Sequence, residues 1–315
     1  HYYYEIKTKK ILIDFFVNSF LPVAILIILG FIAAKKSLFN YSESLAIIKY
    51  VGLIAVPAIT LKMTLSINFS IINWLLISNY VVSEIIIYLM AMLLCRYLFK
   101  LNWSESVIIG MASSFANHLL FVYPMALNEY EADLINPIIA IIGFDVIFLV
   151  INLIILDCLK FQKLSLKIIF LKQFSNIPLL AFIIGLLIII FEIKLPITIS
   201  RSVDFISESA APCALFAAGI ILSQRLEKTQ IKISYLIVTF KVILHPILAI
   251  ILIWNLNKID FSVSETTIMV ASAPVGLMAL IFSTQYGVNP NPITRALLIT
   301  TILSIVIIPL AGTLS

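Results

Sequence analysis

The most constraining feature of this sequence is a charge-free apolar run that is interrupted near its centre by polar residues and a proline. It extends from Ser106 to Asn128 and contains Asn117, His118 and Pro124. A membrane-spanning helix needs about 20 mostly apolar residues, so the run can cross a bilayer. A proline removes a backbone hydrogen bond, and unpaired backbone groups are tolerated at membrane depth only inside protein or beside a cavity. The run therefore predicts a broken transmembrane helix, with the break placed at about residues 117–122 and Pro124 as its helix-breaking residue.

A second apolar run is interrupted in the same way around Pro274, Val275 and Gly276. Paired interruptions in the two halves of a membrane protein point to the binding site of a secondary transporter. Only 12% of the residues are charged and 62% are hydrophobic, whereas a soluble domain carries about 25% charged residues. We therefore interpret the chain as an all-α, polytopic membrane transport protein.

Apolar runs separated by charged residues predict ten membrane spans with short connections. The expected spans are residues 14–34, 44–65, 71–95, 105–127, 134–157, 175–193, 204–224, 233–255, 265–286 and 293–313. They form two halves, 1–157 and 175–315, joined by a connection at 158–174. Lysine and arginine are more numerous in the odd-numbered connections, which predicts that these are cytoplasmic and that both termini lie outside the cytoplasm.

The central connection contains Lys160, Lys163 and Lys167 at helical spacing, with apolar residues between them. This pattern is typical of a short amphipathic helix that lies on a membrane surface rich in anionic lipid. A docking site for a protein partner is the alternative. The pattern favours the membrane surface.

Equivalent residues in the two halves are separated by a constant number of sequence positions. Asn117 of span four corresponds to Pro274 of span nine, and Glu84 of span three to Lys241 of span eight, both at an offset of 157 residues. Five spans in each half is an odd number, so the second copy must be inverted in the membrane. Inverted repeats of this kind place substrate sites near the bilayer midplane.

The order and spacing of several short motifs resemble those of the auxin efflux carrier family of membrane transport proteins. Asn117 is followed seven residues later by Pro124, and further motifs occupy residues 176–185, 211–219, 241–246, 273–276 and 282–288. The resemblance covers nearly the whole chain. The chain lacks the long hydrophilic loop of the plant members between spans five and six, which favours a microbial-type carrier of small anions other than auxin.

The resemblance implies two inverted five-span repeats of the elevator type, similar to sodium/bile-acid symporters. Spans one, two, six and seven would form a scaffold, and spans three to five and eight to ten a moving transport domain. The broken spans four and nine would cross beside the substrate, a small organic anion such as a carboxylate. The resemblance also suggests a homodimer formed through the scaffold, in a plasma membrane or a bacterial inner membrane.

The candidate substrate site consists of Asn117, His118, Phe121, Pro274, Val275 and Gly276. Asn117 could donate its amide to a carboxylate, or it could only satisfy carbonyls freed by the break. His118 is either a packed, hydrogen-bonded side chain or a proton-coupling group. Phe121 would line the pocket or belong to the core. With Asn117, the backbone of residues 274–276 is expected to line a central cavity.

Four ionisable residues at membrane depth form a candidate coupling network. A charge at the centre of a span costs about 2.5–3.5 kcal/mol on insertion scales, so each should have a partner or face water. Glu84 and Lys241 could be a structural ion pair, or Lys241 could attract the anion while Glu84 titrates. His245 lies one helical turn after Lys241 and could tune it. Asp145 could be a proton or cation site, or a hydrogen-bonded structural acid.

These features favour a carrier over two other classes of protein. An intramembrane enzyme would need clustered carboxylates or a nucleophile with its base, and no His-Glu-x-x-His or Gly-x-Ser-x-Gly motif occurs. A membrane-embedded ligand sensor with the carrier fold is the second alternative. We expect no cofactor, metal site or nucleic-acid partner. Proton-coupled movement or potential-driven export is favoured over sodium symport.

Overall fold

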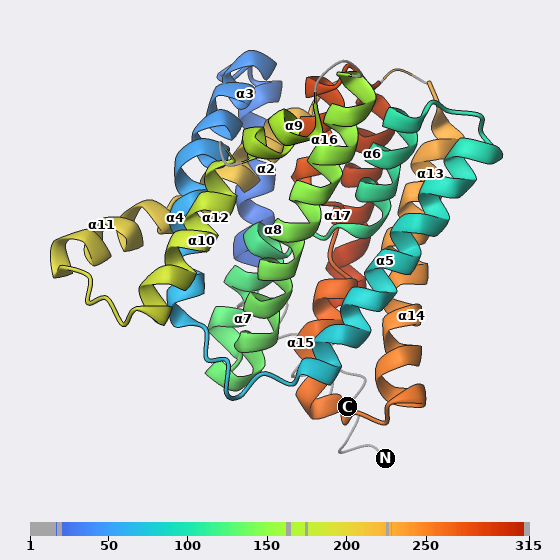
Figure 1. The fold of residues 1–315 in the computed structure, drawn as a ribbon. Coiled ribbons are helices and arrows are strands. Elements are labelled where there is room, and N and C mark those ends of the chain that lie inside the picture. Colours follow the sequence, from blue (N-terminus) through green and yellow to red (C-terminus); the bar gives the residue numbers. More distant parts are fainter. Residues whose placement is uncertain are drawn as a thin grey trace. The chain divides into compact units, whose positions relative to one another are not determined.

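The computed structural model describes residue 17 and residues 21–161, 165–173, 176–224, 227 and 229–311 (Figure 1). Helices account for all the regular structure in these ranges apart from one isolated β-bridge. The chain divides into two compact units by internal contacts. Unit 1 contains the described residues of 1–25, 72–138 and 225–315, and unit 2 those of 26–71 and 139–224.

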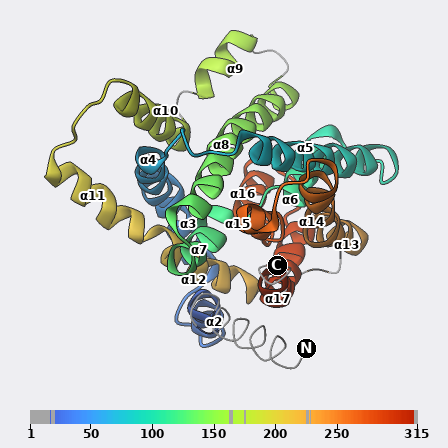
Figure 2. The same cartoon turned by 90° about the horizontal axis from the view of Figure 1, so that it is seen from below.

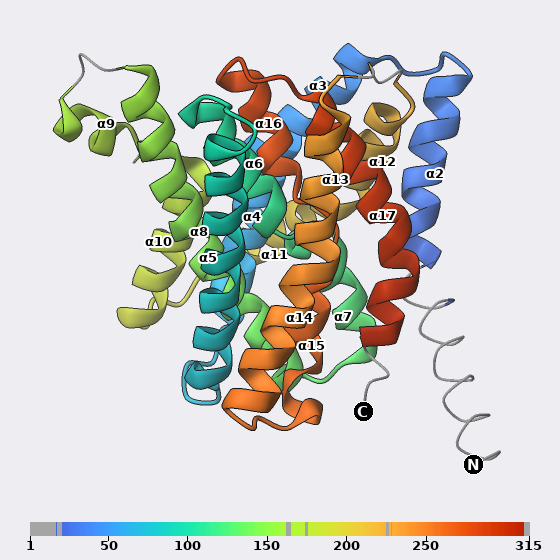
Figure 3. The same cartoon turned by 90° about the vertical axis from the view of Figure 1, so that its right-hand side faces the viewer.

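Unit 1 is formed by two groups of helices that are far apart in the sequence. The first comprises α5 (Trp74–Tyr97), α6 (Trp103–Ser114), η3 (His118–Val122) and α7 (Tyr123–Glu129). The second comprises α13 (Ile231–Thr239), η4 (Phe240–Leu244), α14 (His245–Ile250), η5 (Ile251–Leu256), α15 (Phe261–Ala271), α16 (Leu277–Gln285) and α17 (Asn291–Ala311). α5 packs against α6 and α14, and α6 also packs against α16. Figure 3 shows α5 running beside α13 and α14.

Unit 2 contains the remaining helices. They are α2 (Leu21–Lys35), α3 (Tyr41–Tyr50), η2 (Val51–Ala55), α4 (Val56–Ser66), α8 (Ala132–Lys160), α9 (Leu166–Gln173), α10 (Ile177–Ile190), α11 (Ile197–Glu208) and α12 (Ala210–Leu222). The first residues of α2 and α8 belong to unit 1. α4 packs against α10 and α11, and α3 against α12. Figure 2 shows α4 beside α10.

The helical, membrane-spanning character expected from the sequence is confirmed. Five helical stretches in the described part of the chain are long and apolar enough to cross a bilayer: Tyr41–Ser66, Trp74–Tyr97, Ala132–Lys160, Ile197–Leu222 and Ile231–Leu256. A bent pair formed by α9 and α10 raises the number to six if it counts as one span. Of the other predicted spans, the fourth and the ninth are broken, the first and the sixth coincide with the shorter helices α2 and α10, and the tenth coincides with the 21-residue helix α17.

Asparagine side chains begin four of these helices. Asn40 and Asn102 each form a capping box with the glutamate three residues later, and Asn73 and Asn176 accept a hydrogen bond from the third residue beyond them. An asparagine at this position satisfies one of the amide groups that have no partner inside the helix. Short-range sequence therefore determines where these four helices start.

Prolines widen three helices instead of ending them. A π-helical turn ends two residues before Pro57, Pro124 and Pro246 in each case. The proline ring clashes with the carbonyl four residues earlier, and a local shift to wider hydrogen bonding removes that clash. The prediction that Pro124 marks the helix break is therefore wrong, because Pro124 lies within a helical stretch that begins at His118.

Candidate functional site

The first break lies between α6 and η3. α6 ends at Ser114, where the amide of Phe115 still donates to the carbonyl oxygen of Met111 at 2.9 Å. Phe115 then has φ −60° and ψ 128°, and Asn117 has φ −83° and ψ 50° before the next helix begins. The chain is therefore non-helical at residues 115–117, slightly earlier than the sequence predicted.

The second break lies between α15 and α16. α15 ends at Ala271, and α16 begins at Leu277 after Gly276, which has φ −71° and ψ 142°. Pro274 and Val275 lie between the two helices and are buried. The interruption of span nine is confirmed at the residues where the sequence predicted it.

The two breaks pair with each other as a minimal antiparallel β-bridge between Ala116 and Val275. The amide of Asn117 donates to the carbonyl oxygen of Pro274 at 3.0 Å, and the amide of Gly276 donates to that of Phe115 at 3.1 Å. Each break thus supplies one donor and one acceptor to the other. This pairing satisfies backbone groups that would be costly to leave unpaired at membrane depth.

Gly276 favours the close approach of these two segments. A Cβ atom added to Gly276 would lie 3.2 Å from the carbonyl oxygen of Ala116 and 3.4 Å from that of Phe115. Both distances are at or below ordinary van der Waals contact. The absence of a side chain therefore allows the two backbones to pair.

Side chains satisfy further backbone groups at the breaks. His118 Nδ1 donates to the carbonyl oxygen of Ala116 at 3.0 Å, within the first break. At the second break the amide of Val275 donates to Thr300 Oγ1 at 3.2 Å, and Lys241 Nζ donates to the carbonyl oxygen of Ala271 at 3.2 Å. The sequence left two roles open for His118, a packed, hydrogen-bonded side chain or a proton-coupling group. In the structure this side chain bonds to its own break.

Asn117 differs from the other polar residues at the breaks. Its backbone amide is engaged by Pro274, but its side-chain amide makes no hydrogen bond to any described residue. The residue is only 8% exposed. An amide that is almost buried, and that no described residue engages, is available to a ligand, because buried polar groups are otherwise hydrogen-bonded.

Two helix amino ends face these breaks. η3 follows Asn117 and α16 follows Gly276, and neither helix start has a side-chain cap. Uncapped amide groups and the helix dipole give such ends a partial positive charge that favours anions. The electrostatics of the paired breaks therefore suit a negatively charged group.

Lys241 is fully buried and lies close to both the second break and His245. Its Nζ donates to His245 Nδ1 at 3.1 Å as well as to the end of α15. A cation at the carboxyl end of a helix is stabilised by the helix dipole. The expectation that His245 interacts with this lysine agrees with the geometry.

Glu84 lies on the face of α5 that packs against η4 and α14. Tyr80, one turn earlier, is 5.4 Å from the ring of His245 between centroids, and Ile87, one turn later, shares a buried cluster with Phe240. Glu84 is fully buried between these two contacts. The structure therefore brings Glu84 and Lys241 to facing helices of the same unit.

The two remaining candidate residues, Asp145 and Phe121, are also buried. Asp145 is 6% exposed and belongs to α8 in unit 2. Phe121 is 1% exposed, which is typical of a core residue. Within the described ranges, no three His, Cys, Asp or Glu side chains are close enough to hold a metal ion.

Three residues that secure the start of α15 had no signal in the sequence. Tyr130 Oη donates to Glu265 Oε1 at 2.5 Å, and Thr266 Oγ1 donates to the carbonyl oxygen of Leu134 at 2.6 Å. These bonds join α15 to Tyr130, which lies between α7 and α8, and to the first turn of α8. The sequence likewise gave no signal that Thr300 accepts from the amide of Val275.

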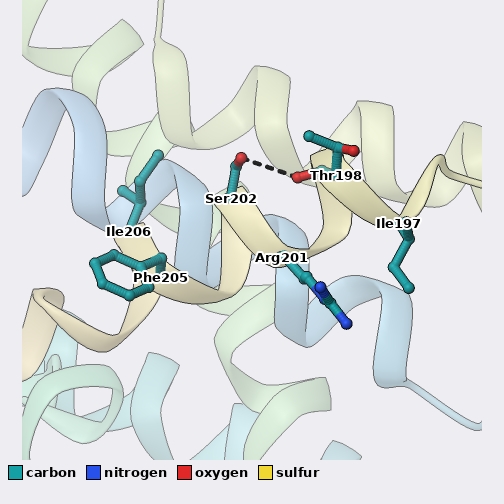
Figure 4. A pocket seen from close by; sticks show the side chains of 6 residues that line it. All are labelled: Ile197, Thr198, Arg201, Ser202, Phe205 and Ile206. Carbon is teal, nitrogen blue, oxygen red and sulfur yellow. Dashed lines mark hydrogen bonds between the residues drawn. The ribbon is translucent and has the colours of Figure 1, made fainter.

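A shallow pocket of about 530 Å³ lies on α11 in unit 2 (Figure 4). It is lined by one face of this amphipathic helix: Ile197, Thr198, Arg201, Ser202, Phe205 and Ile206. Ser202 Oγ donates to the carbonyl oxygen of Thr198 at 2.9 Å, so part of its polar lining is already paired. The pocket does not involve any residue predicted to bind the substrate.

Comparison with known proteins gives a family match and several relatives. Residues 160–311 match the family described as "Membrane transport protein". A protein named "Putative malonate transporter" from Rhizobium meliloti is 35% identical over 111 residues, which is 35% of this chain and 34% of the relative. A protein named as an uncharacterized transporter from Methanocaldococcus jannaschii is 25% identical over 305 residues, 93% of this chain and 96% of that protein.

A third relative is the lysosomal cholesterol signaling protein of Mus musculus. It is 22% identical over 306 residues, which is 89% of this chain but 35% of the mouse protein. The matched stretches thus span about a third of the length of the mouse and Rhizobium meliloti relatives.

Proposed function

We propose that this chain, of which residues 160–311 match the membrane transport protein family, is a member of that family and a secondary carrier of small organic anions. The observation that supports this most directly is the environment of Asn117. Its side-chain amide is nearly buried, is not engaged by the described residues, and lies where two uncapped helix ends begin. A carboxylate could accept from this amide and from the free backbone amides of those helix ends.

The name of the Rhizobium meliloti relative makes malonate a reasonable first substrate to test. Malonate has two carboxylates joined by one carbon, and the paired breaks offer two helix amino ends. One carboxylate at each end is a simple arrangement that would use both. We propose small dicarboxylates as the substrate class.

We further propose the ten-span, inverted-repeat, elevator-type architecture. Its support is that both spans four and nine are interrupted and that their interruptions pair. The grouping of spans three, four, eight, nine and ten in unit 1, and of spans two, six and seven in unit 2, resembles the proposed division into transport domain and scaffold. Two spans differ from that division: most of span five belongs to unit 2, and span one is divided between the two units.

Coupling is proposed to involve Glu84 and Lys241. Moving an anion against an inside-negative potential costs about 2.3 kcal/mol per charge for each 100 mV, so import needs a compensating cation. A buried carboxylate facing a buried ammonium could take up a proton for this purpose. Proton-coupled import and potential-driven export are both compatible with this pair, and we favour them over sodium symport.

The remaining proposals are a homodimer formed by unit 2, and an orientation with both termini outside the cytoplasm in a plasma or bacterial inner membrane. The excess of lysine and arginine in alternate connections supports the orientation. A membrane-embedded ligand sensor is the alternative function, because the mouse relative is named as a signaling protein.

A thermal-shift experiment on purified protein tests the substrate site. Malonate should raise the unfolding temperature, because a ligand at 100 times its Kd stabilises the native state by about 2.7 kcal/mol. Dimethyl malonate, which has no charge, should have no effect. Asn117→Ala should remove the malonate shift while the protein remains folded.

Asn152→Ala is the matched control for this experiment. Asn152 is buried in α8, and its amide donates to the carbonyl oxygen of Phe148 at 2.8 Å. This variant should keep the malonate shift. An unchanged shift in Asn117→Ala would show that the asparagine is structural. Uptake of radiolabelled malonate into proteoliposomes then distinguishes a carrier from a sensor.

A further inference from the structure

The short helix α9 has an exposed apolar ridge flanked by lysines. Ile168 and Leu171 are 52% and 54% exposed, and Lys167 and Lys172 are exposed on either side of them. At 3.6 residues per turn these four positions cover an arc of about 140°. Ile169 is buried on the opposite side. This arrangement is typical of a helix that lies at a membrane interface.

A buried carboxylate fixes the orientation of α9. Asp157, in the last turn of α8, has a side chain that is 2% exposed. Lys172 Nζ donates to both of its oxygens at 2.9 and 3.0 Å, and Gln173 Nε2 donates to Oδ2 at 3.3 Å. These bonds hold one side of α9 against the end of α8. The ridge of Ile168 and Leu171 consequently faces away from the protein.

An aromatic ring, that of Phe161, also contacts the lysine that is bonded to Asp157. Lys172 Nζ lies 5.1 Å from the ring centroid of Phe161, and Lys160 Nζ lies 5.7 Å from it. Both lysine head groups are therefore gathered at the junction of α8 and α9. Residues 158–173 contain four lysines and no acidic residue, so the junction is strongly positive.

The direction of α9 also suits a membrane surface. α9 and α10 are inclined at 71° to each other. α10 is uninterruptedly apolar after its proline, so it is expected to follow the bilayer normal. A helix at 71° to the normal would lie nearly in the membrane plane. Figure 3 shows α9 set at an angle beside the end of α8.

We propose that α9 and the end of α8 form a binding surface for anionic phospholipids. Ile168 and Leu171 enter the boundary between head groups and acyl chains, and Lys160 and Lys167 contact lipid phosphates. Lys172 is already paired with Asp157 and acts as the anchor. The surface is separate from the proposed substrate site, and it does not depend on what the protein carries.

Hydrogen–deuterium exchange of the full chain in nanodiscs tests this proposal. The amides of residues 166–173 should exchange more slowly when phosphatidylglycerol is added to phosphatidylcholine. The extra protection should fall in 1 M salt, where the screening length decreases to about 3 Å. Equal protection of α9 in the two lipid compositions would overturn the proposal.

Charge variants make the test specific. Lys160→Gln with Lys167→Gln should reduce the phosphatidylglycerol-dependent protection by about fivefold for each lysine removed, given about 1 kcal/mol per basic residue near an anionic surface. The matched control is Lys36→Gln with Lys49→Gln, which removes the same charge from α3 and the turn after α2. This control should retain the full effect.

Two additional results would contradict a lipid surface. The first is full phosphatidylglycerol dependence in the Lys160→Gln, Lys167→Gln variant. The second is equal protection when inorganic phosphate is added to phosphatidylcholine nanodiscs, because this would indicate a site for a free anion. The unfolding temperature of each variant in detergent should match that of the unmodified chain, which excludes a general loss of folding.

Discussion

The helix contacts inside unit 1 bury a different kind of chemical group from the helix contacts inside unit 2. In unit 1 the helices α6 and α15 are followed by extended segments whose backbone groups bond to each other, to Thr300 and to Lys241. In unit 2, α2 and α12 meet at Gly30 and Gly219. A Cβ atom on Gly30 would overlap the carbonyl oxygen of Phe216, and one on Gly219 would overlap that of Ile27.

The contact of α2 with α12 in unit 2 is therefore tightly packed, whereas the contact between the two breaks in unit 1 is polar. Small residues let membrane helices approach until their backbones touch, and van der Waals contact then stabilises them. Broken helices place polar groups at membrane depth, where they can meet a ligand. We therefore expect substitutions in unit 2 to act on folding, and the most informative substitutions in unit 1 to act on binding.

The largest effect is expected for Gly219→Ala in unit 2. The new methyl group would collide with the backbone of α2, and such overpacking should lower the free energy of unfolding by about 3 kcal/mol. Thermal unfolding in detergent measures the change. Gly52→Ala is the matched control, because a Cβ there has nothing within 4 Å. A Gly219→Ala protein as stable as this control would show that α2 and α12 are not in close contact.

The next largest effect is expected for Lys241→Met in unit 1. The substitution leaves the carbonyl of Ala271 and Nδ1 of His245 without this donor, and an unsatisfied buried group costs about 1–3 kcal/mol. It also leaves Glu84 facing an uncharged side chain. The unfolding temperature should fall.

Adding Glu84→Gln to Lys241→Met sharpens this prediction. If the two charges balance each other, the double variant should be more stable than Lys241→Met alone. It should also retain transport if the pair is only structural. Loss of malonate binding in the double variant would instead assign Lys241 to the substrate. Sodium-dependent uptake by this variant would refute both assignments.

A smaller effect is expected for Thr300→Val. This change removes the acceptor for the amide of Val275 at nearly constant volume, and the loss of one buried hydrogen bond costs about 1 kcal/mol. Thr301→Val is the control, since Thr301 is next in the helix and makes no hydrogen bond within the described ranges. Equal unfolding temperatures for the two variants would show that Thr300 does not support the second break.

The smallest effect on stability is expected for Asn117→Ala. Its side-chain amide has no bond to the described residues, so its removal should change the free energy of unfolding by less than about 0.5 kcal/mol. Thermal unfolding without ligand measures this. A decrease comparable to that of Lys241→Met would show that the amide satisfies the first break and would weaken its assignment to substrate.

Several features of the fold could be predicted because their causes are local. Apolar runs of sufficient length form helices at membrane depth, since only a helix satisfies its own backbone there. Asparagines begin helices through bonds to residues two or three positions away. The second break was correctly placed at Pro274 to Gly276 for the same reason, because proline and glycine act on their own stretch of backbone.

The sequence by itself thus determined a helical membrane protein with two interrupted spans and a set of polar residues near them. Only the tertiary structure decided how these residues are used. It pairs Ala116 with Val275, assigns Lys241 to the end of α15, bonds His118 to its own break and leaves the side-chain amide of Asn117 without a bond to the described residues. The physical reason is that each unpaired backbone group needs one particular partner at about 3 Å. In this fold, those partners come from segments that are distant in the sequence.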